Sequence, residues 1–400
     1  MKIQFSPPDV SELEIEEVIK ALKSGWITTG PRTKELERQV AAFCGVNRAV
    51  CLNSQTACAE MALRLLGVGE GDEVITSAYT YTASASVIDH VGAKIVLVDT
   101  QKDSLEMDYT KLADAITERT KVIIPVDIAG VPCDYDKIFS VVESKRGLFK
   151  AVNDYQKAFG RIIVLADTAH AFGATWHGKP VGGIADFSAF SFHAVKNFTT
   201  AEGGALTWRT VEGIDDNEIY VKLQLLSLHG QNKDALAKTK LGAWEYDIIG
   251  TWYKCNMTDV AAAMGLAQMQ RYPGMLARRR EIIGRYDAAF RPLGIKTLDH
   301  YTENYASSGH LYLARVPDAT VDIRNEIIMK MAERGIACNV HYKPLPMHTA
   351  YKKLGFDIKD YPNAYKNFEN EITLPLHTRL SDGEVDYVIK SFCEIVREYR

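Results

Sequence analysis

A lysine and an aspartate stand out in this chain because their types and settings suit cofactor chemistry. Lys196 follows an apolar run and has Val195 and Phe198 beside it, and burial makes a lysine a usable nucleophile. Asp167 closes another apolar run upstream. A lysine that can form a Schiff base, with a carboxylate that can pair with a pyridinium nitrogen, is what a pyridoxal phosphate (PLP) enzyme needs. The pair therefore predicts PLP chemistry.

Both residues, and a nearby histidine, also have plainer interpretations. Lys196 taken alone could be a solvated surface lysine, and Asp167 could be the N-cap of a helix. His170 could hydrogen-bond a ring oxygen of the cofactor, or it could be structural. The residue types alone leave these alternatives open.

Other segments could complete such a site. The segment 53–57 joins an expected strand to a helix, and the unpaired N–H groups at a helix start bind phosphate. Tyr81 follows the next expected strand, where its ring could stack on a planar cofactor or belong to the core or an interface. The pair Gly203 and Gly204 would let the backbone approach a ligand closely.

The elements that must position these residues alternate between strands and helices. Apolar β-branched runs predict strands at 48–54, 72–77, 93–99, 121–127, 161–167, 187–192 and 204–208, with a helix over 56–66. Nearly continuous Val, Ile and Leu is typical of parallel strands buried on both faces. Asp99, Asp127 and Asp167 end such strands, so we expect them to point into a ligand crevice at the carboxyl edge of the sheet.

The sequence changes character after about residue 245, and 400 residues exceed one ordinary core. Helices are expected over 258–271 and 275–290, and a second α/β section from His310 to the end. Its last helix opens with the capping box Ser381-x-x-Glu384. The stretch 134–160 predicts a helix plus a surface excursion. We expect a large domain at 1–250, and a small C-terminal domain with connecting helices at 251–400.

Composition and charge exclude several classes of protein. The 46% apolar and 24% charged content is that of a soluble globular chain, and a net charge of −4 without a basic stripe argues against nucleic acid or membrane as partners. The N-terminus lacks the apolar region of a secretion signal. The seven scattered cysteines lack metal-ligand spacing, so we expect reduced thiols, a cytoplasmic protein and no metal.

With these segments in order, the chain resembles the DegT/DnrJ/StrS family of PLP-dependent nucleotide-sugar aminotransferases. The likeness rests on ordered motifs at 25–31, 69–75, 167–174, 191–204, 256–263, 340–345 and 374–376. It implies an α/β protein of PLP-dependent transferase fold type I. The large domain would hold a mostly parallel seven-stranded sheet, beside a smaller C-terminal α/β domain. It also implies a homodimer with shared active sites.

The resemblance assigns roles by matching position. It implies that Lys196 carries the PLP and that Asp167 pairs with the pyridinium, with His170 near the phenolic oxygen. Tyr81 takes the ring-stacking position. The remaining implied residues are the phosphate ligands Gln55, Thr56 and Ser191 and the substrate-binding residues Thr29, His193, His341 and Tyr342.

Two segments depart from the family pattern. Members reach the partner's cofactor phosphate from a segment that commonly reads Asn-Tyr-Arg, whereas this chain has Lys-Cys-Asn at 254–256. We expect Lys254 to make the contact. The stretch 134–160 is the second departure, and no family role carries over to it.

The form Ser-Phe-His-x-x-Lys-Asn followed by Ala-Glu-Gly-Gly looks closest to bacterial enzymes that aminate C4 of UDP-linked 4-keto sugars. We therefore expect transfer from glutamate to C4 of a UDP-linked 4-keto-6-deoxy sugar, for surface polysaccharide or glycan biosynthesis. The alternatives are C3 amination of a dTDP-linked 3-keto sugar, a non-catalytic regulator with this fold, and an unrelated α/β binding protein. Dehydratases of the family replace the lysine with histidine, so Lys196 argues for transamination.

Overall fold

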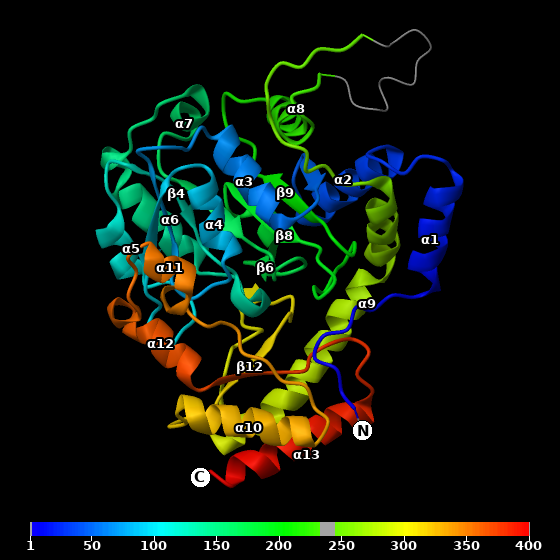
Figure 1. Cartoon of the computed structure of the whole chain (residues 1–400), viewed down its shortest axis with the longest axis vertical. Helices are drawn as coiled ribbons and strands as arrows, with labels where there is room; N and C mark the ends of the chain where they lie inside the picture. Colours follow the sequence, from blue (N-terminus) through cyan, green and yellow to red (C-terminus); the bar gives the residue numbers. More distant parts are fainter. Residues whose placement is uncertain (1, 233–244, 400) are drawn as a thin grey trace.

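The computed structural model describes residues 2–232 and 245–399 and has an α/β architecture (Figure 1). Its main sheet has seven strands in the order β1-β9-β8-β5-β4-β2-β3. Their bounds are β1 (Ala49–Leu52), β2 (Glu73–Ser77), β3 (Lys94–Val98), β4 (Thr120–Ile124), β5 (Ile163–Asp167), β8 (Phe187–Ser191) and β9 (Gly204–Trp208). Strand β9 is antiparallel to both β1 and β8, and the other pairs are parallel. The expected mostly parallel seven-stranded sheet is confirmed.

Both faces of this sheet are buried, as the apolar runs predicted. In β5, Ile163 and Leu165 join one apolar cluster, whereas Val164 and Ala166 join the cluster on the opposite face. The period of two in side-chain direction explains this division. The first face carries α3 (Gln55–Leu65), α4 (Ala83–His90) and α8 (Asp216–Ser227), and the second carries α2 (Pro31–Cys44), α5 (Tyr109–Ala115) and α6 (Tyr135–Ser144).

One long helix, α9 (Asp259–Phe290), replaces the two helices expected at 258–271 and 275–290. Pro273 lies inside it, and a proline there removes one backbone hydrogen bond and favours a break. Packing along both halves offsets this cost. The first half lies against α1 (Glu12–Lys23) and α2, and the second half contributes Ile282 and Tyr286 to an apolar cluster with α13 (Asp382–Arg397). Figure 1 shows α9 running from α1 and α2 toward α13 and α10 (Val321–Glu333).

A smaller antiparallel sheet forms the second layer of the fold. It comprises β10 (Lys296–Thr297), β12 (Tyr312–Arg315) and β13 (Glu371–Leu374), and it packs against α10 (Val321–Glu333) and α13. The capping box of Ser381 and Glu384 at the start of α13 is present, as expected. The connections include α11 (Thr349–Lys353), α12 (Pro362–Glu369) and the short strands β6 (Thr175–Trp176), β7 (Lys179–Pro180) and β11 (Tyr305–Ala306).

The stretch 134–160 forms α6, a 3₁₀ turn at Arg146–Leu148 and the short helix α7 (Asp154–Phe159). This agrees with the expected helix and surface excursion. Within residues 2–232 and 245–399, no helix has both the length and the apolar character needed to cross a bilayer.

Candidate active site

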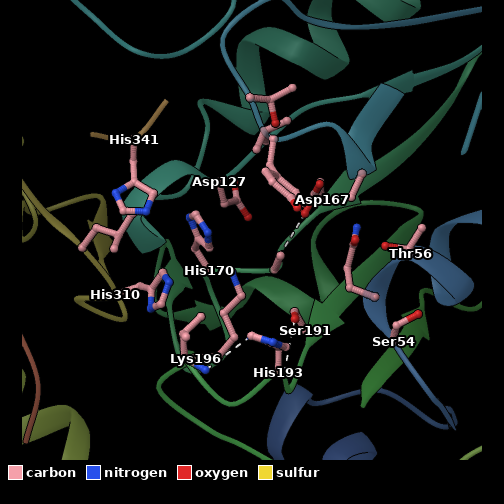
Figure 2. Close-up of a pocket in the computed structure, with 18 of the residues that line it drawn as sticks. Ser54, Thr56, Asp127, Asp167, His170, Ser191, His193, Lys196, His310 and His341 are labelled. Carbon is pink, nitrogen blue, oxygen red and sulfur yellow. Dashed lines mark hydrogen bonds between the residues drawn. The ribbon is translucent and has the colours of Figure 1, made fainter. Parts of the chain in front are cut away.

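A cavity of about 370 Å³ lies where β4, β5 and β8 end, and its size falls in the range of small-molecule pockets (Figure 2). All the site residues predicted from the sequence line it, except Thr29 and Lys254. They are Gln55, Thr56, Tyr81, Asp167, His170, Ser191, His193, Lys196, His341 and Tyr342. Segments far apart in the sequence therefore meet in one space.

Lys196 enters the cavity from the loop after β8. Its backbone N–H donates to the carbonyl of His193 over 2.9 Å, which fixes the turn that carries it. Burial lowers the pKa of Lys196 to about 8, against the opposing attraction of Asp167. A substantial share of its side chain is thus neutral amine near physiological pH, as a nucleophilic lysine requires.

Asp167 ends β5 and is buried at the floor of the cavity. One carboxylate oxygen accepts from the Ser84 hydroxyl over 2.6 Å, and the other accepts from the backbone N–H of Ala169 over 3.1 Å. A turn follows Asp167 instead of a helix, so the helix N-cap interpretation is wrong. Burial raises the pKa of Asp167, and the hydrogen bond from Ser84 opposes that rise. The carboxylate is therefore suited to pair with a cationic N–H group.

The proton on His170 can be placed from its two hydrogen bonds. Its Nδ1 accepts from the backbone N–H of Ala129 over 3.1 Å, and its Nε2 lies 3.0 Å from the Tyr342 hydroxyl. Burial holds the pKa of His170 well below its usual range, so the ring is neutral. The single ring proton is then on Nε2 and is donated to Tyr342. This leaves the Tyr342 hydroxyl proton available to a ligand.

The start of α3 offers an anion site. Ser54 caps the helix by accepting from the N–H of Ala57 over 3.1 Å. Among the described residues, the backbone N–H groups of Gln55 and Thr56 have no acceptor, and the Gln55 side-chain nitrogen is buried without a partner. The Ser191 hydroxyl lines the same part of the cavity. These unpaired donors at a helix N-terminus suit the phosphate of PLP.

The glycine pair acts differently from the expectation. A Cβ on Gly204 would lie 2.5 Å from both the backbone nitrogen of Gln55 and the carbonyl carbon of Ser54. Gly204 therefore allows β9 to approach the start of α3, so the close contact is within the protein. Gly203 does line the cavity.

Two further polar residues, Asp127 and His310, line the cavity. Asp127 was expected in the crevice as the end of a strand, and this prediction is confirmed. Its carboxylate accepts from the Tyr135 hydroxyl and from the backbone N–H of Cys133, and burial raises its pKa to about 7. The ring of His310 lies 4.3 Å from that of His170, and its Nδ1 contacts the Asn197 side chain over 2.9 Å. His310 stands alone in its segment, so its spacing offered no signal.

Asp99 was expected in the crevice, and this prediction is wrong. It accepts from the backbone N–H of Ala364 over 2.8 Å and pairs with Lys111 over 3.1 Å. Strand β3 is the edge strand of the sheet, so its end lies away from the central strands that carry the cavity. Asp99 instead holds the start of α12.

Thr29 and Lys254 lie together outside the cavity. The Lys254 amine contacts the Asn256 side chain, whose amide nitrogen donates to the Thr29 hydroxyl. Thr29 in turn donates to the carbonyl of Met257 over 2.6 Å. Thr29 is buried and Asn256 half-buried, whereas Lys254 is exposed and faces outward just before α9.

The whole chain is similar to known aminotransferases. A family model described as the DegT/DnrJ/EryC1/StrS aminotransferase family matches residues 8–393. The chain is 38% identical to the spore coat polysaccharide biosynthesis protein SpsC of Bacillus subtilis, over 99% of this chain and 97% of that protein. It is 34% identical to the UDP-4-amino-4-deoxy-L-arabinose–oxoglutarate aminotransferase of Shewanella sediminis, over 99% of each chain.

A solved structure gives a similar result for the fold. The PLP-form of the putative sugar aminotransferase Spr1654 from Streptococcus pneumoniae matches with a TM-score of 0.96 and 57% identity, over 100% of both chains.

Proposed function

Because the chain belongs to the DegT/DnrJ/EryC1/StrS aminotransferase family, we propose that it is a PLP-dependent enzyme acting on a UDP-linked 4-keto-6-deoxy sugar. It would transfer an amino group from glutamate to C4 of that sugar. One observation carries this proposal: Lys196, Asp167 and the start of α3 border a single cavity. A nucleophile, an anion and an anion-binding helix end thus face the same space.

The cavity residues fit PLP in the following way. The N–H groups of Gln55 and Thr56, with the Ser191 hydroxyl, would hold the phosphate. Asp167 would pair with the ring nitrogen, and Tyr81 would cover a face of the ring. When bound, the cofactor supplies an aldehyde that takes up an amino group and a ring that accepts electrons. The unpaired donors at the α3 start support this assignment.

Lys196 would bind the cofactor covalently and then move protons. Its Nζ takes up and returns a proton at the substrate carbon, which is general acid–base work that contributes roughly 10²–10⁴-fold to a rate. A pKa of about 8 suits both directions of this transfer near neutral pH. Asp167 would keep a positive charge on the ring nitrogen, and the Ser84 hydroxyl holds that carboxylate in place. His170 would donate from Nε2 through Tyr342 toward the cofactor oxygen.

The relatives' names support the substrate class. The Shewanella enzyme is named for a UDP-linked 4-amino sugar and for oxoglutarate, the keto acid that glutamate leaves after giving up its amine. The Bacillus relative is named for spore coat polysaccharide biosynthesis. A 4-amino sugar destined for a surface polysaccharide is thus the product we propose. His193, His341 and Tyr342 would contact the sugar.

We place the site at the interface of a homodimer in the cytoplasm. Lys254 is exposed and is linked through Asn256 to the buried Thr29, and Lys254 would reach the cofactor phosphate of the partner. Charge-assisted contacts to phosphate are strong, so a lysine there adds to the backbone donors. The seven cysteines are all free thiols, which agrees with a reducing compartment. The division into domains 1–250 and 251–400 is part of the same proposal.

The first half of the reaction offers the test. Purified protein loaded with PLP and mixed with glutamate alone should convert its cofactor to the amine form and release one equivalent of 2-oxoglutarate. Borohydride added before glutamate should attach the cofactor to Lys196, located by peptide mass. The Lys196→Ala variant should bind PLP but release no keto acid. Attachment at another lysine, or keto acid release by the variant, would contradict the proposal.

A further inference from the structure

Two buried residues of β13, Glu371 and Thr373, lie directly behind His341. Asn339 and Thr373 exchange backbone hydrogen bonds of 3.1 and 2.8 Å. The pairing is antiparallel. His341 comes two residues after Asn339 and Glu371 comes two residues before Thr373, so His341 and Glu371 lie opposite each other. Both β13 side chains are completely buried, whereas His341 lines the cavity.

A continuous chain of hydrogen bonds joins the three side chains. The Thr373 hydroxyl lies 2.6 Å from one oxygen of Glu371 and 2.9 Å from Nδ1 of His341. The backbone N–H of His341 donates to the other oxygen of Glu371 over 2.8 Å. No described residue forms a hydrogen bond with Nε2 of His341.

The ring of His341 is also fixed from its other sides. Phe5 stacks on it, with ring centroids 5.6 Å apart and planes 16° apart. The Tyr79 hydroxyl donates to the backbone carbonyl of His341 over 2.8 Å. These contacts hold the ring plane and the backbone in place, and turning the ring over would break the hydrogen bond between Nδ1 and the Thr373 hydroxyl, so Nδ1 stays on Thr373.

We propose that Glu371 and Thr373 determine which nitrogen of His341 carries the proton, and thereby whether His341 can donate a hydrogen bond to an oxygen of the substrate. The substrate part of this inference rests on the proposed function, in which a keto sugar occupies the cavity. Glu371 and Thr373 touch neither substrate nor cofactor, so both are positioning residues.

The charge on Glu371 fixes where the protons of Thr373 and His341 lie. An ionised Glu371 can only accept, so the Thr373 hydroxyl donates to it and must accept from an N–H at Nδ1 of His341. Nε2 is then bare. A neutral Glu371 donates to Thr373, whose own proton turns to Nδ1, and the single ring proton of His341 is then on Nε2. One proton on Glu371 thus reverses the hydrogen bond offered at the cavity.

The two states match different ligand groups. A keto oxygen has no proton to give, so it can be bound only by the form with N–H at Nε2. An amino or hydroxyl group can donate to Nε2 when that nitrogen carries no proton. A protonated Glu371 therefore favours binding of the keto sugar through His341.

The surroundings of Glu371 make both states accessible. Burial raises the pKa of Glu371 to about 8, and the same effect lowers the pKa of His341 to about 4, so the ring is neutral throughout. The arginines near Glu371 are already engaged, because Arg324 donates to the carbonyls of Phe368 and Glu371 itself and Arg315 donates to Asn367. The titratable and charged groups that face Glu371 are Arg315, Arg324, Tyr79, Cys338, His341 and Tyr342.

Nitrogen NMR of histidine-labelled, PLP-loaded protein tests the inference without any assay of activity. The His341 signals are identified by their loss in a His341→Gln variant. We expect the protonated nitrogen to change from Nε2 at pH 6.5 to Nδ1 at pH 9.5. A single form across this range would overturn the proposal.

Matched variants test whether Glu371 and Thr373 cause this change of the protonated nitrogen. In Glu371→Gln the amide oxygen accepts from the backbone N–H of His341, so the amide NH2 group faces Thr373 and donates to it. The Thr373 hydroxyl then donates to Nδ1, and His341 should keep its proton on Nε2 at every pH. Thr373→Ser keeps the hydroxyl and should keep the transition, whereas Thr373→Val should abolish it. Glu369→Gln is the control and should behave as wild type, because Glu369 ends α12 and its side chain pairs with Lys366. A transition that persists in Glu371→Gln would also overturn the proposal.

The proposed hydrogen bond between His341 and the substrate is tested by steady-state kinetics. Between pH 7 and 9.5, kcat/KM for the keto sugar should fall at least threefold more in wild type than in Glu371→Gln. The difference between the two proteins reports Glu371, because Lys196 titrates in the same range in both. Identical profiles would reject the contact with substrate. If no nucleotide-linked keto sugar is turned over while the NMR transition is present, the proposed function fails and the control of His341 stands.

Discussion

The Ser84 hydroxyl donates a hydrogen bond of 2.6 Å to Asp167, linking the first turn of α4 to the end of β5. The Thr80 hydroxyl lies 2.8 Å from that of Ser84. With Asp167 ionised, the Ser84 proton is committed to the carboxylate, so Thr80 donates to Ser84 in turn. Two buried hydroxyl groups thus support the anion that we assign to the cofactor ring.

Replacing Ser84 with alanine should weaken the enzyme most at low pH. Hydrogen bonds to charged groups contribute about 1.5–3 kcal/mol, so we expect turnover at pH 7 to fall by roughly 10-fold or more. Burial already raises the pKa of Asp167, and loss of the Ser84 hydroxyl raises it further. Less carboxylate is then ionised at a given pH, and the loss should shrink as pH rises. The measurement is kcat against pH.

Ser86→Ala on the same helix provides the control for that experiment and should retain wild-type turnover. Equal activity of Ser84→Ala and wild type at every pH would show that the hydrogen bond does not support catalysis.

The rate at which PLP-free protein captures PLP should rise with pH and reach half its maximum near pH 8. Only the neutral amine of Lys196 attacks the aldehyde, and the pKa of Lys196 is lowered to about 8. At pH 7 this increases the share of neutral amine by roughly 300-fold over an ordinary lysine. Because Asp167 favours the charged amine, Asp167→Asn should move the midpoint below that of wild type. Stopped-flow absorbance measures the capture rate.

If the capture rate of the wild type had its midpoint near the pKa of an ordinary lysine, burial would not lower the pKa of Lys196. An unchanged midpoint in Asp167→Asn would show that the two groups do not interact.

The sequence was sufficient to predict the strands and the cavity residues that end them. Asp167 could be placed because a continuous apolar run fixes a buried parallel strand, and its last residue must face the carboxyl edge. The same reasoning failed for Asp99, because the order of strands in the sheet is not encoded in any local pattern. β3 turned out to be the edge strand, whose end lies beside α12.

Contacts between distant segments could not be predicted. His310 reaches the cavity only because the chain returns there after α9. Ser84, in the first turn of α4, contacts Asp167 at the end of β5, far from it in the sequence. The continuity of α9 through Pro273 has the same origin, since packing on α1, α2 and α13 outweighs the local preference for a break. Tertiary packing decides such cases, and single residues do not reveal it.

Mixed dimers test the proposed sharing of sites. Lys196→Ala chains and Lys254→Glu chains should each be inactive alone, the first for lack of the nucleophile and the second because a carboxylate would repel the partner's phosphate. A mixed dimer has one site with an intact Lys196 facing an intact Lys254, so activity should recover to about a quarter of the wild-type value in a statistical mixture. Activity per chain is measured after native mass spectrometry verifies the mixed species.

Lys390→Glu on α13 is the control for the charge change and should be active alone. If verified mixed dimers remain inactive while both single variants are inactive, Lys254 does not act across the interface.

The transfer of nitrogen from glutamate to a sugar is the activity that we propose, and it can be followed with an isotope. The PLP-loaded protein is incubated with ¹⁵N-glutamate and a panel of UDP- and dTDP-linked 3-keto and 4-keto sugars, and the products are analysed by mass and NMR. We expect ¹⁵N bound at C4 of a UDP-linked 6-deoxy sugar, with an equal amount of 2-oxoglutarate, and neither product with the Lys196→Ala variant. Nitrogen at C3 of a dTDP-linked sugar, or no transfer to any sugar in the panel, would contradict it.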